Sequence, residues 1–136
     1  MRTHTTVDRL LEAVLAHDMA AFAAEWAPDG TMDFPFAPPG GVTHLEGRAA
    51  VAAYLEGYTD AVLPRRVTWE QRHDTADPAT VVVEFTVAGD VAATGAPYEM
   101  RYVAVISVGD DGITSYRDYW NPLAFPTTGA AGGPSW

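Results

Sequence analysis

The periodicity of the sequence changes at Pro64, and this change limits the folds open to the chain. Before Pro64, apolar residues recur at helical spacing in three segments. After it come four long segments rich in Val, Tyr and Ile, separated by breaks that contain Gly, Asp and Pro. Helices followed by strands in this way are typical of an α+β fold, with one sheet packed on a helical layer.

The same patterns predict the bounds of the elements. The predicted helices cover residues 5–17, 18–27 and 47–63. The predicted strands cover residues 31–36, 66–74, 79–88, 98–108 and 113–120. We expect residues 1–125 to form a single domain, and residues 126–136, which have no periodicity, to form a flexible tail.

Composition excludes several classes of partner. The chain has 8 Lys and Arg against 18 Asp and Glu, a formal net charge of −10, which disfavours nucleic acid and anionic membranes. It has no Cys, no signal-peptide pattern and no apolar run near the roughly 20 residues of a membrane helix. The four His lack metal-ligand spacing, and phosphate or dinucleotide fingerprints are absent. We expect a cytoplasmic protein that needs no cofactor and binds a small, mostly apolar molecule.

The last predicted strand carries a carboxylate between two aromatic residues. Strand alternation places Asp118 on the same face as Tyr116 and Trp120. A carboxylate on such an apolar face has a raised pKa unless a charged partner or hydrogen bonds satisfy it. Asp118 is therefore the candidate general acid or base. The alternative is a structural carboxylate that either pairs with an arginine, Arg72 or Arg101, or lies in a wet mouth of the cavity.

The turn before this strand decides which way Asp118 points. A three-residue loop at 110–112, with Gly112 in the left-handed conformation, sets one register of the hairpin. That register gives the cross-strand pairs Ala104–Asp118, Tyr102–Trp120 and Ile106–Tyr116. Asp118 then faces the helices, and the small Ala104 leaves space opposite it. A four-residue turn pairs Asp118 with Val103 instead.

Aromatic residues from several elements are candidates for a pocket around Asp118. A tyrosine hydroxyl can hold a substrate oxygen, whereas an inward-facing ring can also serve as core, and both roles stay open. The candidate substrate-binding residues are Tyr102, Tyr116, Trp120, Tyr54, Tyr58, Phe34, Trp26 and Ala104.

The remaining conspicuous polar residues have structural explanations. His73 and Asp74 are adjacent on a strand and point to opposite faces, so we expect His73 to be an exposed titrating group. Asp33 lies opposite the apolar face of its strand and is expected to be solvated or paired. His44 lies in the predicted loop after that strand, where it can overhang a cavity mouth.

Taken together, these features resemble a known family. The helix–helix–strand–loop–helix–sheet order, Gly47 before the third helix and a final strand reading Arg117-Asp118-Tyr119-Trp120-Asn121-Pro122 resemble the SnoaL-like branch of the nuclear-transport-factor-like superfamily. The resemblance covers about residues 5–123. It implies a cone in which a curved mixed sheet wraps three helices around an apolar pocket. It also implies a homodimer through the outer face of the sheet.

The individual branches of the superfamily differ in how well their functional residues match this sequence. Ketosteroid isomerases need a base Asp, a Tyr on the first helix and an Asp on a later strand, and the matching positions here are Phe34, Leu10 and Ala104. The chain therefore lacks that design. Its last strand is similar to those of phenazine-biosynthesis A/B proteins and limonene epoxide hydrolase, in which Asp118 matches an acid. The hydrolase also needs an Arg-x-Asp pair, but Arg101 is followed by Tyr-Val.

We therefore predict a cofactor-free isomerase, cyclase or dehydratase of secondary metabolism with a polyketide-like or aromatic substrate. Asp118 would move the proton, and Tyr102, Tyr116 and Trp120 would shape the pocket. The alternatives are a non-catalytic binding protein that sequesters an apolar compound, and an epoxide hydrolase. A third is an interaction module like the transport members of the superfamily.

Overall fold

A computed structural model of the chain describes residues 2–124 and confirms the predicted α+β class. The helices are α1 (Arg2–Leu15), α2 (Met19–Ala23), α3 (Arg48–Leu55) and α4 (Tyr58–Ala61), with a final 3-10 turn, η1 (Pro122–Ala124). The strands are β1 (Trp26–Asp33), β2 (His44–Glu46), β3 (Val62–Asp74), β4 (Thr80–Val91), β5 (Pro97–Gly109) and β6 (Gly112–Trp120). The predicted tail, residues 126–136, lies outside the described residues.

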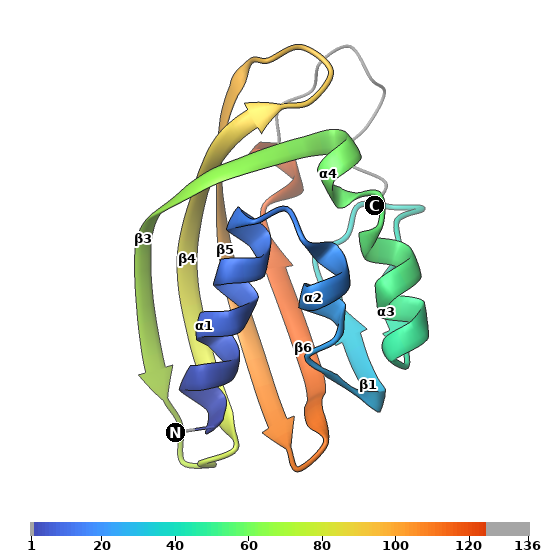
Figure 1. Cartoon of the computed structure of the whole chain (residues 1–136), viewed down its shortest axis with the longest axis vertical. Helices are drawn as coiled ribbons and strands as arrows, with labels where there is room; N and C mark the ends of the chain where they lie inside the picture. Colours follow the sequence, from blue (N-terminus) through green and yellow to red (C-terminus); the bar gives the residue numbers. More distant parts are fainter. Residues whose placement is uncertain (1, 125–136) are drawn as a thin grey trace.

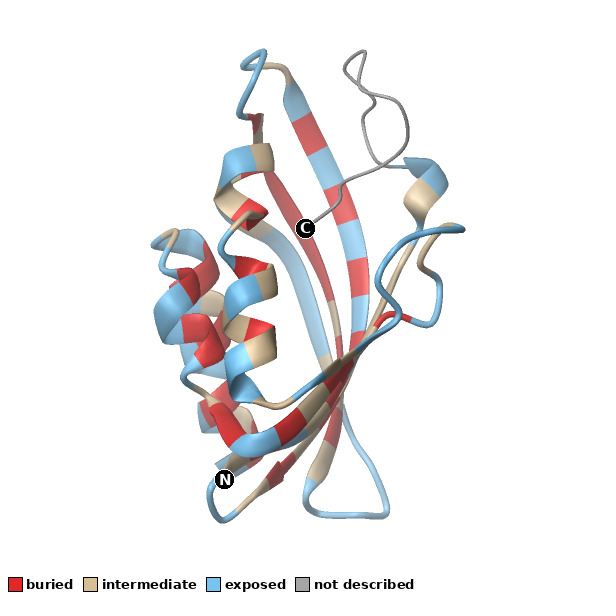
Figure 2. Cartoon of the chain, turned by 90° about the vertical axis from the view of Figure 1, so that its right-hand side faces the viewer, coloured by how far each residue is buried: buried red, intermediate tan, exposed pale blue. Residues whose placement is uncertain are grey.

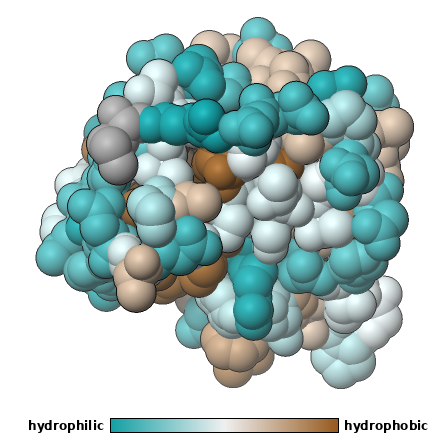
Figure 3. All heavy atoms as spheres, turned by 90° about the horizontal axis from the view of Figure 1, so that it is seen from below, coloured by the Kyte–Doolittle hydropathy of each residue, from teal (hydrophilic) through white to brown (hydrophobic). Residues whose placement is uncertain are grey.

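The strands form one mixed sheet that curves around the helical layer. Its order is β2-β1-β6-β5-β4-β3, with β1 and β6 parallel and all other neighbours antiparallel. Helices α1, α2 and α3 cover its concave side (Figure 1). Strand β5 alternates between buried and exposed residues, and its buried side faces the helices (Figure 2). Seen from below the view of Figure 1, polar side chains surround small areas of apolar ones (Figure 3).

The register between β5 and β6 is the predicted one, but the turn that sets it is different. Ala104 pairs with Asp118, as expected, and the two neighbouring predicted pairs also form. Gly109 pairs with Gly112, so the loop has two residues rather than three. A register shift near Thr114 adds the missing residue to β6 and restores the alternation.

Trp26 lies at the start of β1 rather than on the second helix. The spacing of Met19, Phe22 and Trp26 fits a helix, yet α2 ends at Ala23. Trp26 is fully buried and stacks on Tyr116 at a centroid distance of 5.3 Å. Its backbone pairs with Ile113 of β6. Parallel pairing with the last strand has therefore overridden the local helical period, and β1 begins five residues earlier than predicted.

The third predicted helix is two short helices followed by a strand. Helix α3 ends at Leu55, and Gly57 precedes α4. Val62 pairs with Val91, so Pro64 lies inside β3 instead of ending a helix. Proline is tolerated there because β3 is an edge strand and its register shifts next to Pro64. A second unpredicted element is β2, a three-residue strand within the predicted loop.

Strand β3 has no clean alternation in its sequence because it contains two register shifts. After the second shift, near Thr68, Trp69 pairs with Thr86 on the outer face, while Glu70 pairs with Phe85 on the inner face. Arg72 is also on the inner face. The bulge thus turns the polar end of β3 towards α1.

Polar contacts join α1 to β3 at both ends of the helix. At the first turns of α1, Arg72 Nη2 donates to Asp8 Oδ1 at 2.6 Å, and His4 Nε2 lies 2.7 Å from Asp74 Oδ1. Just after the helix, His17 Nε2 donates to the Pro64 carbonyl oxygen at 2.6 Å. Since a carbonyl oxygen only accepts, this nitrogen carries the proton.

The membrane prediction can be compared with the helices directly. Among residues 2–124, no helix combines the length and apolar character that a membrane crossing requires.

Gly112→Ala tests the close approach between β6 and the start of β1. Gly112 has φ +121°, and an added Cβ would lie 2.5 Å from the Glu25 carbonyl oxygen. We expect the free energy of unfolding to fall by roughly 2–4 kcal/mol in urea titrations. Gly95→Ala is the control, because Gly95 has φ +72° but a Cβ added there would meet no atom within 4 Å. It should lose about 1 kcal/mol, from backbone strain alone. Equal losses in the two variants would contradict the packing argument.

Candidate functional site

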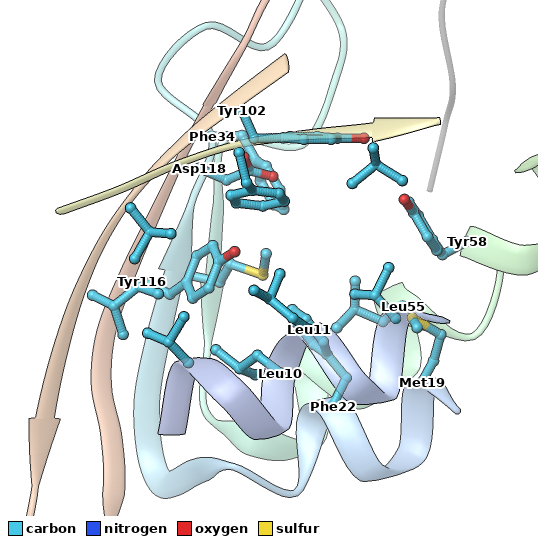
Figure 4. Close-up of a pocket in the computed structure, with 17 residues that line it drawn as sticks. Leu10, Leu11, Met19, Phe22, Phe34, Leu55, Tyr58, Tyr102, Tyr116 and Asp118 are labelled. Carbon is cyan, nitrogen blue, oxygen red and sulfur yellow. The ribbon is translucent and has the colours of Figure 1, made fainter. Parts of the chain in front are cut away.

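A cavity lies between the helices and the inner face of the sheet (Figure 4). The centres of water-sized molecules can occupy about 60 Å³ of this cavity. The empty space between its lining atoms is about 680 Å³, a volume that includes solvent at the opening. Its apolar lining residues are Val7, Leu10, Leu11, Val14, Met19, Phe22, Met32, Phe34, Leu55, Val83, Phe85, Val87 and Ile106. Its polar lining residues are Tyr58, Tyr102, Tyr116 and Asp118. The site is therefore narrow and mostly apolar, with one carboxyl group.

Asp118 has an unpaired oxygen buried in this cavity. Its Oδ1 has no hydrogen-bond partner among the described residues and no exposed surface. The residue as a whole is half-buried, and it lines the cavity. Desolvation disfavours the charged form and raises the pKa of Asp118 to about 7. The group can therefore exist as both acid and carboxylate near neutral pH.

The alternative ion pair with an arginine does not form. Arg72 bonds instead to Asp8 and Glu70. Arg101 is exposed and lies opposite Thr86, on the outer face of the sheet. No cationic side chain from residues 2–124 lines the cavity. Nothing in the described lining therefore offsets the burial of the Asp118 carboxylate.

The tyrosines around the cavity remain neutral over the ordinary pH range. Burial, followed by the nearby Asp118 carboxylate, raises the pKa of Tyr102 and of Tyr116. The same two causes raise the pKa of Tyr54 to about 12. These phenols act as hydrogen-bond donors or acceptors without carrying charge.

The structure brings five of the nine predicted site residues to the cavity: Phe34, Tyr58, Tyr102, Tyr116 and Asp118. The other four lie behind or beside its lining.

Two of these four support lining residues, and one leaves room. Trp26 stacks behind Tyr116, and Tyr54 packs on Phe34 at a centroid distance of 5.2 Å. Ala104 is fully buried directly across from Asp118. Trp120, the fourth, borders a separate surface hollow with Phe36 and Tyr119.

Sequence reasoning missed the contribution of β4 to the site. Phe85 stacks on Tyr102 with a centroid distance of 5.0 Å and an interplanar angle of 19°. The alternation of Val83, Phe85 and Val87 with the more polar Glu84 and Thr86 was present in the sequence. It could have identified these three residues as inward-facing.

The histidines lie away from the cavity lining. His44 Nδ1 lies 2.6 Å from Asp33 Oδ1, which confirms that Asp33 is paired. Hydrogen bonds to Asp33 and then to Glu46 raise the pKa of His44. His73 is exposed, as predicted, and its Nε2 lies 2.6 Å from Glu84 Oε2. Within residues 2–124, His and acidic residues form no group of three or more suited to a metal ion.

Comparison with known proteins agrees with this fold. The family model for the SnoaL-like domain matches residues 7–116. The chain belongs to the SnoaL-like family. The uncharacterized protein YesE of Bacillus subtilis is 36% identical over 118 residues, covering 87% of this chain and 80% of that protein.

Two further relatives have a named activity. The steroid Delta-isomerase of Nocardioides simplex is 32% identical over 117 residues, covering 85% of this chain and 87% of that protein. A crystal structure from Bacillus subtilis, described as a candidate isomerase, is 35% identical and has a TM-score of 0.83. That match covers 88% of this chain and 86% of the other. The family context is thus one of small-molecule isomerases and related enzymes.

Asp118→Asn tests the burial of the carboxyl group through stability. The folded-state pKa of about 7 lies above the unfolded value, so the proton stabilises the fold. This contribution is complete below about pH 4 and is lost as pH rises to about 7. Three pKa units correspond to about 4 kcal/mol as an upper bound. The variant should therefore be within about 1 kcal/mol of wild type at pH 4.5 and exceed it by up to about 4 kcal/mol at pH 8, in urea unfolding.

The exposed Asp111 provides the matched control. Asp111→Asn should change stability by the same small amount at both pH values. If Asp118→Asn behaves in the same way, the carboxyl group is solvated and its raised pKa is refuted.

Proposed function

We propose that this protein is a cofactor-independent isomerase, cyclase or dehydratase that uses Asp118 as its general acid and base. The substrate would be a small apolar molecule with a carbonyl group, of polyketide-like or aromatic type. The observation that carries the proposal is the buried, unpaired Oδ1 of Asp118 in an otherwise apolar cavity. A pKa near the working pH gives useful amounts of both the base and its conjugate acid.

The simplest reaction that this arrangement supports is a proton shift beside a carbonyl. The Asp118 carboxylate removes a proton from the carbon next to the carbonyl, and the electron pair of that C–H bond moves to the carbonyl oxygen as an enolate forms. A tyrosine hydroxyl at the cavity donates a hydrogen bond to that oxygen. The Asp118 carboxylic acid then returns the proton to a different carbon. Exclusion of water strengthens each of these interactions.

The similarity to a steroid Delta-isomerase supports this class of reaction, although the acid is placed differently. Phe34, Leu10 and Ala104, which match the functional residues of ketosteroid isomerases, are buried and apolar here. Asp118 is the direct cross-strand partner of Ala104. Facing side chains of paired strands have Cβ atoms about 5 Å apart, so β6 supplies a carboxyl group near the place where β5 lacks one.

The strongest competing function is binding without catalysis. A narrow apolar cavity with a protonated carboxyl group also suits a protein that sequesters a neutral compound. The epoxide hydrolase alternative has less support, because no cationic side chain of the described lining accompanies Asp118. Incorporation of labelled solvent oxygen into a product would distinguish it from an isomerase.

Cyclohex-3-enone is a suitable first probe for catalysis. Its isomerisation to the conjugated cyclohex-2-enone is followed by ultraviolet absorbance. We expect wild-type kcat to rise with pH through about 7 as the Asp118 carboxylate forms. Asp118→Asn should lower kcat by about 10²–10⁴-fold and change KM little. Retained turnover in the variant would refute the role of Asp118, whereas wild type that binds the ketone without converting it would favour the sequestration function.

We also propose a homodimer through the outer face of the sheet. Trp69 is 48% exposed and Val103 is 36% exposed on that face, beside a surface hollow that includes Thr86 and Arg101. Large apolar side chains that are exposed in a single chain commonly mark a surface that another protein chain covers. Val103→Asp should shift the protein from dimer to monomer in sedimentation equilibrium. A wild-type protein that sediments as a monomer at micromolar concentration would refute this proposal.

A further inference from the structure

Tyr116 and Asp118 reach the cavity from the same strand, two residues apart. Both line the cavity, and the Tyr116 hydroxyl and the Asp118 carboxyl group point into the same space (Figure 4). Alternate residues of a strand share one face and lie about 6.5 Å apart along it. The longer tyrosine side chain carries its hydroxyl further from β6 than the aspartate carries its carboxyl group. One strand therefore presents a hydroxyl and a carboxyl group to a single small ligand.

The Tyr116 hydroxyl is available to a ligand. Burial, Asp118 and Tyr58 raise the pKa of Tyr116, and no hydrogen bond with another side chain is among the causes. The hydroxyls of Tyr58 and Tyr102, by contrast, are close enough to hydrogen-bond to each other. Among the three tyrosines that line the cavity, Tyr116 is therefore the one whose hydroxyl is engaged by no side chain of residues 2–124.

Aromatic neighbours fix the direction of the Tyr116 ring. It stacks on Trp26 at a centroid distance of 5.3 Å and an interplanar angle of 28°, and Phe22 packs on it at 6.2 Å. Trp26 is fixed in turn, because it is fully buried and its Nε1 donates to the Thr31 carbonyl oxygen at 3.0 Å. A donor that is held in place beforehand needs no reorganisation when charge develops on a substrate oxygen.

Burial gives the two groups different protonation states at the same pH. Burial, followed by the Asp118 carboxylate, raises the pKa of Tyr116 well above its usual value. Burial raises the pKa of Asp118 only to about 7. Above neutral pH, Asp118 is therefore a base, while Tyr116 remains a neutral hydrogen-bond donor.

We propose that Tyr116 donates a hydrogen bond to the carbonyl oxygen of the substrate while Asp118 removes a proton from the carbon next to that carbonyl. This inference rests on the proposed function of Asp118 and names the catalytic partner of that residue. A base and an oxyanion donor each approach their reacting atom to about 3 Å. The oxygen and the acidic carbon are bonded to the same carbonyl carbon, so two groups that are two strand positions apart can reach both.

The reaction leaves Tyr116 unchanged. The electron pair of the broken C–H bond moves to the carbonyl oxygen, where the Tyr116 hydrogen bond stabilises the enolate. The pair returns to carbon when the Asp118 carboxylic acid delivers the same proton to another carbon of the enolate. Tyr116 keeps its own proton throughout.

The position of Tyr116 also orients the substrate. Its hydroxyl lies on the β6 side of the cavity, and the lining continues away from it towards Leu55 and Tyr58 (Figure 4). That part of the lining is mostly apolar, and no cationic side chain from residues 2–124 contributes to it. The substrate is therefore a ketone or aldehyde whose apolar part extends away from β6. A carboxylic acid is disfavoured, because its charge would meet the Asp118 carboxylate.

The carbonyl stretching frequency of a bound ketone tests the hydrogen bond directly. The probe is cyclohex-2-enone, isotope-labelled at the carbonyl carbon and measured by difference infrared spectroscopy at pH 8.5. At this pH Asp118 is a carboxylate, so among the described lining side chains only a tyrosine can donate. The band should lie at lower frequency in wild type than in Tyr116→Phe. Tyr54→Phe removes a hydroxyl outside the cavity lining and should keep the wild-type frequency.

The rate of isomerisation tests whether the same hydrogen bond acts in the transition state. Tyr116→Phe should lower kcat for cyclohex-3-enone by about 10²–10³-fold, the usual effect of removing one donor to a developing oxyanion. KM should change by less than about threefold, since the ring and the rest of the cavity are kept. The rise of kcat with pH should keep its midpoint near 7, because Asp118 is still present.

The inference is overturned if the bound ketone has the same frequency in wild type and in Tyr116→Phe, or if Tyr116→Phe keeps wild-type turnover. Loss of the shift in Tyr102→Phe but not in Tyr116→Phe would also overturn it, as would a wild type that binds no ketone. Asp118→Asn separates this inference from the proposed function, since that variant should lose turnover and keep the shifted band. Full turnover in Asp118→Asn would refute the role of Asp118 but not the Tyr116 hydrogen bond.

Discussion

The pairing of Ala104 with Asp118 is the constraint on which the rest of the site depends. Side chains alternate along a strand, so a slip of one residue between β5 and β6 would move Asp118 to the outer face together with its aromatic neighbours. The bulge near Thr114 prevents that slip by absorbing the residue that the short turn leaves over. Local backbone geometry some distance from the cavity therefore determines whether this protein has a buried acid at all.

Position 118, in the cavity lining, carries a polar side chain where the stability of the fold alone would favour an apolar one. Isoleucine or leucine at position 118 would add to the core, whereas the carboxyl group leaves Oδ1 without a partner. Natural sequences tolerate such departures mainly at functional positions, and Asp118 lines the cavity.

Sequence reasoning predicted the fold class, the inward face of the last hairpin and the position of Asp118 on it. These features follow from strand alternation and turn chemistry, which act over a few residues. It failed where distant segments decide the local structure. Trp26 fits a helical stripe but is drawn into β1 by pairing with Ile113, and Pro64 fits a helix end but lies in an edge strand. The separation of Tyr54 from the cavity lining and the position of Tyr58 on it depend on helix orientation, which periodicity does not encode.

The attachment of α1 also bears on how a ligand enters. The helix is fixed to β3 by ion pairs near its first turns and by the His17 hydrogen bond just beyond its end, and between them it touches the cavity through apolar side chains such as Leu11. An arriving apolar ligand can replace those middle contacts, but it cannot replace the polar ones. Since the Arg72–Asp8 pair is partly exposed and is screened by salt, concentrated salt weakens one of the contacts that hold α1 against β3, while the apolar contacts in the middle of the helix are left in place.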